Sequence, residues 1–292
     1  MPKLDLIAIA DFAAGARENC GASTFRENLL LHHPGITSKA GEERICEVIA
    51  HEMAHQWFGN LVSPSDWKYL WLNESFATYF GYGIVAHYYP EWEIWDQFLG
   101  GTTDVALIRD SLHETFSIEI PGGEHVVINA STAPIIYSKG GSILRQVEGY
   151  IGHECFKAGL RHYLKQHEYD CASSHHLWKA LEETSSQPVT KLMKSWVEQP
   201  GHPVVEVKRE GGRLHFTQSR FTFLVVLGSE EHRLEHGVQL VLRGTPLHFL
   251  AVGDLGAIKR QRARQVIDTV AQPQSDGHVG RAGHRGAPRR RC

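Results

Sequence analysis

The sequence predicts a mainly helical α+β domain with a small sheet over residues 1–199, then the start of a small β-domain over 200–255 and a disordered basic tail over 256–292. Apolar residues recur at the spacing of buried helix faces between residues 39 and 199. Beyond Pro203, apolar and polar residues alternate, which is typical of strands. A chain of 292 residues can hold two domains, with ample core for the first.

The first predicted elements are a strand and a long helix. An apolar run over residues 3–10 predicts the strand. Ser38 is suited to cap a helix that begins near Lys39, and the acidic residues that follow favour its first turn through the helix dipole. Apolar residues at four later positions give this helix a wide buried face, and Gly59-Asn60 predicts its end.

The most informative motif of the chain, His51-Glu52-Met53-Ala54-His55, lies on this helix. At this spacing both imidazoles face the same side of a helix, one turn apart, where a single cation can bridge them. Eighteen residues separate His55 from Glu74, which supplies a carboxylate. Two histidines and one carboxylate leave the fourth tetrahedral position of a zinc ion open for water, as in catalytic sites. Glu52 lies beside these ligands, where it can act as a general base.

Glu74 belongs to a second predicted helix, which opens at Trp71 and ends before Pro90. A carboxylate without a partner among aromatic residues is unfavourable, and a metal would satisfy it. Two plainer interpretations exist, namely a surface helix that carries a histidine pair and a first-turn glutamate favoured by the dipole. The apolar sequence around both segments favours the metal site over either of them.

Three further stretches accompany the metal motif: residues 11–19 (Asp-Phe-Ala-Ala-Gly-Ala-Arg-Glu-Asn), residues 90–95 with two tryptophans, and residues 136–141 (Ile-Tyr-Ser-Lys-Gly-Gly). With His51-Glu52-x-x-His55 and Asn73-Glu74-Ser75, they resemble the M1 family of zinc aminopeptidases, in the gluzincin group. The branch they resemble most includes the archaeal and bacterial tricorn-interacting aminopeptidases. The resemblance covers about residues 3 to 220 and implies a thermolysin-like catalytic domain.

The resemblance implies one zinc ion per chain, held by His51, His55 and Glu74. Zinc would polarise the scissile carbonyl and lower the pKa of its water to about 7. Glu52 would take a proton from that water and pass it to the leaving amine. The implied activity is hydrolysis of the N-terminal peptide bond of oligopeptides.

The resemblance also implies how a peptide would be held. Glu18 would bind the free α-amino group through a charge-assisted hydrogen bond, and the backbone at Gly15 and Ala16 would line the peptide as an extended edge. Tyr137 would donate its hydroxyl to the oxyanion of the tetrahedral intermediate. Taken without the family, Glu18 reads as a solvated loop carboxylate and Tyr137 as a half-buried aromatic at a strand end, before a turn at residues 139–141.

The chain departs from the family pattern in two ways. Arg17 stands where the family usually has Met and Cys20 where it usually has Trp, and a guanidinium next to Glu18 is able to pair with it and compete with the substrate amine. Family members are also far longer, with an N-terminal β-domain. The chain is therefore expected to be truncated at its N-terminus, with a first strand that lacks a neighbour.

The second half of the chain continues with predicted helices at residues 142–147, 156–164, 177–184 and 189–197. Pro200-Gly201-His202-Pro203 predicts a boundary, and a hairpin around Gly211-Gly212 opens the β-domain. Residues 256–292 contain nine Lys or Arg against two Asp, a net charge of +7. This composition predicts disorder and is compatible with a nucleic-acid contact, but we favour an aberrant reading frame and expect no nucleic-acid partner.

No apolar run reaches membrane-spanning length and no signal peptide opens the chain, so we expect a cytoplasmic protein with no membrane partner. Nothing in the sequence indicates an oligomeric state. Three functions stay open: a zinc aminopeptidase, a catalytically impaired or inactive fragment that still binds zinc, and an epoxide hydrolase or endopeptidase on the same scaffold. Glu18 disfavours the third, because an internal peptide bond offers no ammonium group.

Overall fold

A three-stranded sheet forms the N-terminal part of the computed structural model, which describes residues 3–120, 127–222, 225–226, 229–230 and 235–241. Its strands are β1 (Asp5–Ile9), β2 (Ala16–Arg17) and β3 (Ala22–Arg26), in the order β1-β3-β2. β1 runs parallel to β3 and β2 runs antiparallel to it. The strand predicted at residues 3–10 is confirmed. It pairs with β3, so the expected missing neighbour concerns one edge only, and within the described chain β1 and β2 are both edge strands.

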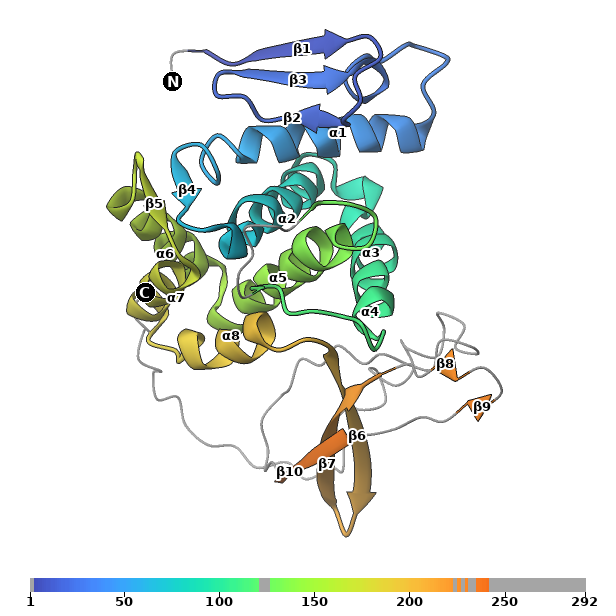
Figure 1. Ribbon diagram of the computed structural model, residues 1–292, viewed down its shortest axis with the longest axis vertical. Coiled ribbons are helices and arrows are strands. Elements are labelled where there is room, and N and C mark those ends of the chain that lie inside the picture. Colours follow the sequence, from blue (N-terminus) through green and yellow to red (C-terminus); the bar gives the residue numbers. More distant parts are fainter. Residues whose placement is uncertain (1–2, 121–126, 223–224, 227–228, 231–234, 242–292) are drawn as a thin grey trace, which may run out of the picture. The chain divides into compact units, whose positions relative to one another are not determined.

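The two predicted metal-binding helices lie next in the chain. α1 (Lys39–Ala54) is capped by the Ser38 side chain, which accepts a hydrogen bond from the Gly41 amide at 3.2 Å, as predicted. α1 ends at Ala54 rather than at Gly59, because tight turns with i to i−3 hydrogen bonds follow at once. α2 (Trp71–Tyr88) packs closely against α1 below the sheet (Figure 1).

Shorter helices and π-helical turns connect α2 to four helices that complete the helical body. They are α3 (Ile94–Gln97), η4 (Phe98–Thr103), α4 (Asp104–Asp110), η6 (Pro134–Lys139), α5 (Gly140–Ile151), α6 (His153–Gln166), α7 (Ser174–Ser185) and α8 (Val189–Glu198). The helices predicted after residue 142 are confirmed in α5–α8. Single 3₁₀ turns occur at η1 (Glu27–Leu29), η2 (Trp67–Tyr69) and η3 (Pro90–Trp92). β4 (Val62–Pro64) pairs in parallel with β5 (Asp170–Ala172).

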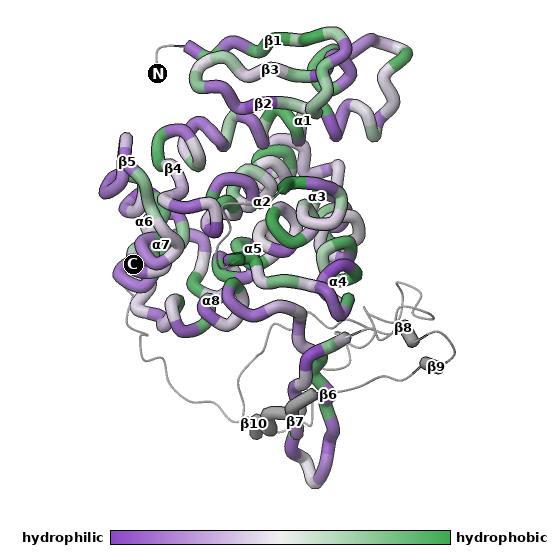
Figure 2. The backbone as a smooth tube through the Cα atoms, in the orientation of Figure 1, coloured by the Kyte–Doolittle hydropathy of each residue, from purple (hydrophilic) through white to green (hydrophobic). Residues whose placement is uncertain are grey.

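A continuous hydrophobic core joins α2 and α5–α8. Trp71, Phe76, Leu144, Leu177 and Met193 are at most 1% exposed within it. Figure 2 shows hydrophobic residues concentrated on α2 and α5, and many polar residues on α6 and α7. α2, which carries Glu74, is part of this core, and α1, which carries His51 and His55, packs against α2.

The chain divides into two units, and the first comprises mainly residues 1–202. The second begins at Pro203 and contains most of β6 (His202–Glu210), β7 (Arg213–Phe221) and β10 (Glu235–Val241), with β7 between the other two. Gly211 and Gly212 have φ of 55° and 78°, the left-handed values of a two-residue hairpin turn, so the predicted hairpin is confirmed. Two short strands, β8 (Val225–Val226) and β9 (Ser229–Glu230), occur between β7 and β10.

The predicted tail over residues 256–292 lies outside the described residues, as does the part of the predicted β-domain after residue 241. Among the helices that the structure describes, none combines the length and apolarity needed to cross a membrane.

Candidate functional site

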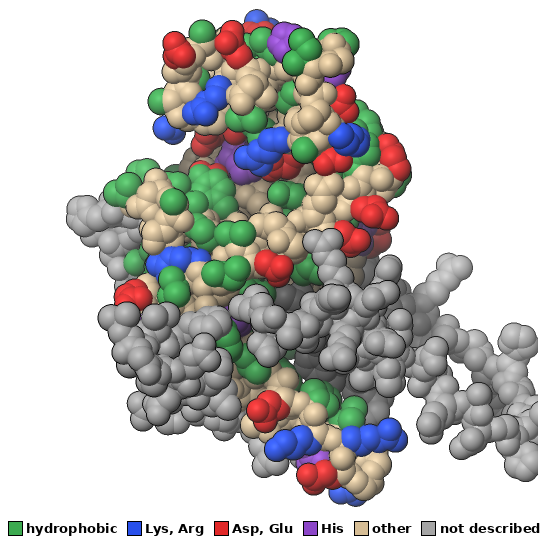
Figure 3. All heavy atoms as spheres, turned by 90° about the vertical axis from the view of Figure 1, so that its right-hand side faces the viewer, with side chains coloured by type: hydrophobic (Ala, Val, Ile, Leu, Met, Phe, Trp, Pro, Cys, Tyr) green, Lys and Arg blue, Asp and Glu red, His purple; other side chains and the backbone are tan. Residues whose placement is uncertain are grey.

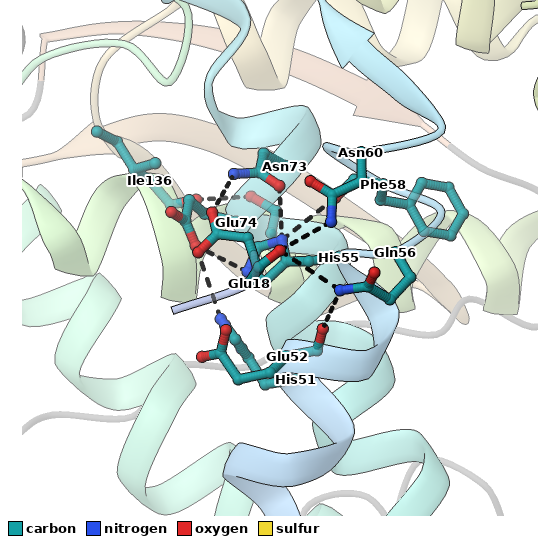
Figure 4. A network of polar contacts seen from close by, with 11 residues as sticks. Glu18, His51, Glu52, His55, Gln56, Phe58, Asn60, Asn73, Glu74 and Ile136 are labelled. Carbon is teal, nitrogen blue, oxygen red and sulfur yellow. Dashed lines mark hydrogen bonds and ion pairs between the residues drawn. The ribbon is translucent and has the colours of Figure 1, made fainter. Parts of the chain in front are cut away.

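The structure brings His51, His55 and Glu74 together at the α1–α2 contact (Figure 4). Both histidine Nε2 atoms face one oxygen of Glu74, from His51 at 3.6 Å and from His55 at 3.5 Å. Ligand atoms at about 2.0–2.1 Å from a tetrahedral zinc ion stand about 3.3–3.4 Å from one another. Both measured distances are therefore close to this spacing, and the three residues form a group that could hold a metal ion.

The second nitrogen of His55 is held by groups that were not predicted. Its Nδ1 lies 2.5 Å from Asn73 Oδ1 and 3.2 Å from the carbonyl oxygen of Phe58. Both neighbours accept hydrogen bonds, so Nδ1 carries a proton and Nε2 is the nitrogen that a cation can bind. The position is crowded, because a Cβ on Gly59 would lie 2.1 Å from Asn73 Oδ1. Gly59 is also at φ 126°, so it is needed here for space and for backbone conformation.

The ligands are strongly coupled electrostatically. Burial alone would raise the pKa of Glu74, but hydrogen bonds from His51 and His55 outweigh it and lower the pKa to about 2. Burial lowers the pKa of His55, and the contact with Glu74 more than offsets this and raises it to about 9. A divalent cation would take the place of the proton that these groups share.

Glu52 is not part of the group formed by His51, His55 and Glu74, but it forms a second group with Glu18 and His55, whose ligand atoms also lie within 4.8 Å of one another. It is 6% exposed, and its Oε2 has no hydrogen-bond partner in the described part of the chain. Burial raises its pKa to about 7, although His51 and His55 act in the opposite direction. A carboxylate with one free oxygen and a pKa near neutrality is suited to proton transfer.

Glu18 reaches the same site from the end of β2. Its carbonyl oxygen accepts hydrogen bonds from the Asn60 side chain at 2.8 Å and from Gln56 at 3.4 Å. Its carboxylate accepts one from Asn73 Nδ2 at 3.4 Å. These three amide side chains were not predicted as site residues, and Asn60 was interpreted only as part of a helix stop. One signal was present in the sequence, since Asn73 directly precedes the ligand Glu74.

Gly15 and Ala16 lie just before Glu18, where the sheet has an open edge. The Gly15 carbonyl accepts the Arg26 amide of β3 at 2.9 Å, and Ala16 pairs with Phe25. Within the described residues β2 has β3 as its only neighbouring strand. Its other edge is therefore not paired with any strand of the described residues.

The pairing of Arg17 with Glu18 that the sequence allows does not form. Arg17 lies opposite Thr24 in the sheet, whereas its neighbour Ala16 lies opposite the fully buried Phe25. Successive strand residues point to opposite faces, so the exposed Arg17 side chain is directed away from the face on which Phe25 is buried. Arg17 forms no ion pair with Glu18, which leaves that carboxylate available.

Tyr137 approaches the ligands from the π-helical turn η6. Its ring stacks over that of His51, with centroids 6.2 Å apart and planes 5° from parallel. Burial and the nearby Glu74 carboxylate raise the pKa of its hydroxyl, so it stays protonated and able to donate. The interpretation of Tyr137 as a strand-end aromatic is thus wrong. The turn expected at residues 139–141 is instead the start of α5, where Gly140 meets Ser75 of α2.

All predicted side chains of the site therefore face one region of the first unit. Figure 3 shows histidine, acidic and basic side chains gathered in a hollow between the N-terminal sheet and the helices. Residues 1–196 match the model of the peptidase family M1 domain. The chain belongs to peptidase family M1.

Named relatives agree with this membership. Aminopeptidase M1 of Arabidopsis thaliana is 46% identical over 221 residues, covering 76% of this chain and 25% of the relative. Leucyl aminopeptidase of Saccharolobus solfataricus is 42% identical over 224 residues, covering 77% and 28%. Tricorn protease-interacting factor F2 of Thermoplasma volcanium is 42% identical over 224 residues, covering 76% and 28%. The chain spans about a quarter of the length of the curated relatives it matches.

Proposed function

We propose that this chain is the catalytic part of a zinc-dependent aminopeptidase, with one zinc ion held by His51, His55 and Glu74. The 3.5 and 3.6 Å spacing of the imidazole nitrogens from Glu74 supports the metal assignment. When bound, zinc supplies Lewis acidity to the scissile carbonyl and lowers the pKa of a water molecule. The helical body with its small sheets, together with the family membership, supports a thermolysin-like architecture.

Glu52 is proposed as the general base. It would accept a proton from the attacking water on its free Oε2 and deliver that proton to the leaving amine. Its burial and its pKa of about 7 support both halves of this transfer, because the group must gain and then lose the proton near neutral pH.

Glu18 is proposed to bind the free amino group of the peptide, with its position set by Asn60 and Asn73. The peptide backbone would extend along β2 at Gly15 and Ala16. A carboxylate at the end of an open strand edge can bind the ammonium group of a peptide that lies along that edge. The N-terminal residue would then lie at the site, which supports release of single N-terminal residues as the reaction.

Tyr137 is proposed to donate a hydrogen bond to the oxyanion as the tetrahedral intermediate forms. Its protonated hydroxyl and its place over His51 support this role.

The proposal depends on the spacing of the two imidazole nitrogens from Glu74. Measuring turnover with and without a chelator and added zinc tests it. We expect the purified chain to release fluorophore from aminoacyl substrates, to lose this activity with a chelator and to regain it with zinc. N-terminally acetylated substrates should be resistant, because Glu18 would then face no ammonium group. One bound zinc per chain without turnover would contradict the proposal and support the alternative, an inactive fragment that still binds zinc.

We propose domain boundaries near residues 199 and 255, a peptide with a free N-terminus as the partner, no nucleic-acid or membrane partner, and a cytoplasmic location. Proteolysis of the purified chain would test the boundaries, since cleavage should concentrate in exposed connecting segments.

A further inference from the structure

A buried ion pair lies outside the group of residues proposed to act on substrate. Lys139 Nζ is 2.9 Å from Asp110 Oδ2, and the two side chains are 6% and 0% exposed. Asp110 is the last residue of α4, and Lys139 is the last residue of η6, two positions after Tyr137. The pair therefore fixes the end of the segment that carries the proposed oxyanion donor.

Further hydrogen bonds hold both partners. Asp110 Oδ1 accepts from Thr115 Oγ1 at 2.8 Å and from the Gly201 amide at 2.9 Å. Lys139 Nζ donates to the Gly201 carbonyl at 3.1 Å, and His202 Nδ1 lies 4.0 Å from Asp110 Oδ2. The pair thus ties α4, η6 and the segment after α8 to one point. Buried ion pairs add little net stability compared with apolar side chains, so stability alone does not explain this one.

The segment between these anchors has an unusual conformation. π-helical turns are rare and are frequently found at functional sites. On the α2 side, Ser75 Oγ donates to the Ile136 carbonyl at 2.6 Å, and a Cβ on Gly140 would lie 1.9 Å from Ser75 Oγ. On the other side stands the Asp110–Lys139 pair. A one-residue change of winding would rotate a side chain about 100° around the helix axis, enough to take the Tyr137 hydroxyl out of the site.

We infer that the Asp110–Lys139 pair is a positioning device for Tyr137, holding η6 in the winding that directs the tyrosine hydroxyl toward the scissile carbonyl. The pair touches neither substrate nor metal and acts through the backbone of η6. This inference rests on the proposed function, because it assigns the pair to the oxyanion donor of that reaction.

The main test removes both charges together, in Asp110→Asn/Lys139→Met, so that no lone charge is left buried. Asn keeps an oxygen that can accept from Thr115 and Gly201. The comparison variants are Tyr137→Phe, the combination of all three substitutions, Lys139→Arg as the conservative change, and Lys165→Met. Lys165→Met removes an exposed ion pair between Lys165 of α6 and Glu168, and it serves as the matched control.

We expect Tyr137→Phe to lower kcat about 100- to 1000-fold, as loss of one oxyanion donor does. The charge-free double variant should lower kcat at least about tenfold, with KM within about twofold of the original and one zinc per chain. The combined variant should be no slower than Tyr137→Phe, because both changes remove the same interaction. Lys139→Arg should recover most of kcat, and Lys165→Met should leave it unchanged.

Binding of an α-aminophosphonic acid, whose tetrahedral phosphorus copies the intermediate, gives a second measurement by calorimetry. Its affinity should fall in parallel for Tyr137→Phe and for the charge-free double variant. If the double variant keeps full kcat and affinity, or if its losses multiply with those of Tyr137→Phe, the positioning role is overturned while the aminopeptidase stands. A zinc-loaded original chain that neither hydrolyses substrates nor binds the phosphonate would overturn the proposed function, and the positioning role with it.

Discussion

The residues proposed to bind the metal and those proposed to bind substrate are positioned by different kinds of structure. His51, His55 and Glu74 lie on two long helices that pack directly on one another, and the two histidines are one turn apart. Glu18 follows a two-residue strand at the edge of a small sheet, and Tyr137 lies on a π-helical turn. The first group is fixed by helix geometry and the second by single long-range contacts.

The two groups are therefore expected to respond differently to substitution of the residues around them. Packing of α1 on α2 positions His51, His55 and Glu74 through many van der Waals contacts along both helices. Glu18 depends on hydrogen bonds from Asn60, Gln56 and Asn73 across more than thirty positions of sequence. We therefore expect substitutions around the metal to act on zinc itself, and substitutions around Glu18 to act on substrate affinity.

The largest effect is expected for His55→Ala, which removes a ligand from the helical group. Zinc bound per chain should fall from one to nearly none at micromolar metal, with turnover lost, because only two protein ligands remain. Zinc analysis and an aminoacyl substrate measure both. His162→Ala on α6, where the ring contacts Glu183, is the matched control and should keep both. Retention of full zinc by His55→Ala, with an unchanged circular dichroism spectrum, would remove His55 from the site.

A smaller and different effect is expected for Glu18→Gln. The variant should keep one zinc, and KM for a free aminoacyl substrate should rise about 10- to 100-fold, since a hydrogen bond to a charged group contributes about 1.5–3 kcal/mol. Glu154→Gln, an exposed glutamate on α6, controls for the change in charge. An unchanged KM together with loss of zinc would mean that Glu18 acts on metal binding and not on substrate affinity.

The smallest effect is expected for Asn73→Ala, because Asn73 contacts both groups. It should weaken zinc binding about tenfold, the lower end of what loss of a partner to a ligating histidine causes. The Phe58 carbonyl limits the loss, since it still accepts from His55 Nδ1. KM should also rise, because Glu18 loses the amide at its carboxylate. Competition against a chromogenic chelator measures the first effect and steady-state kinetics the second. If only the zinc affinity or only KM changes, Asn73 does not link the proposed zinc ligands to the proposed substrate-binding residues.

The same contrast explains what could be predicted from the sequence. Periodic spacing placed α1 and α2, and with them the three ligand positions and Glu52, because helix geometry converts separation in sequence into position. For Arg17, adjacency in sequence suggested a contact with Glu18, whereas strand pleating turns neighbours to opposite faces. Asn60, Gln56 and the Asp110–Lys139 pair meet their partners through folding of distant segments, for which a single sequence has no periodic signal.

The central claim is that Glu52 is the base of a zinc-dependent reaction and not a ligand of its metal. Measuring zinc content and kcat together in Glu52→Gln tests it most directly, because Gln has almost the same shape and cannot accept the proton. We predict one zinc per chain, unchanged thermal stability to within a few degrees, and a kcat reduced at least about 1000-fold, in the range of combined loss of acid and base catalysis. Loss of zinc from this variant, or survival of its activity, would contradict the account.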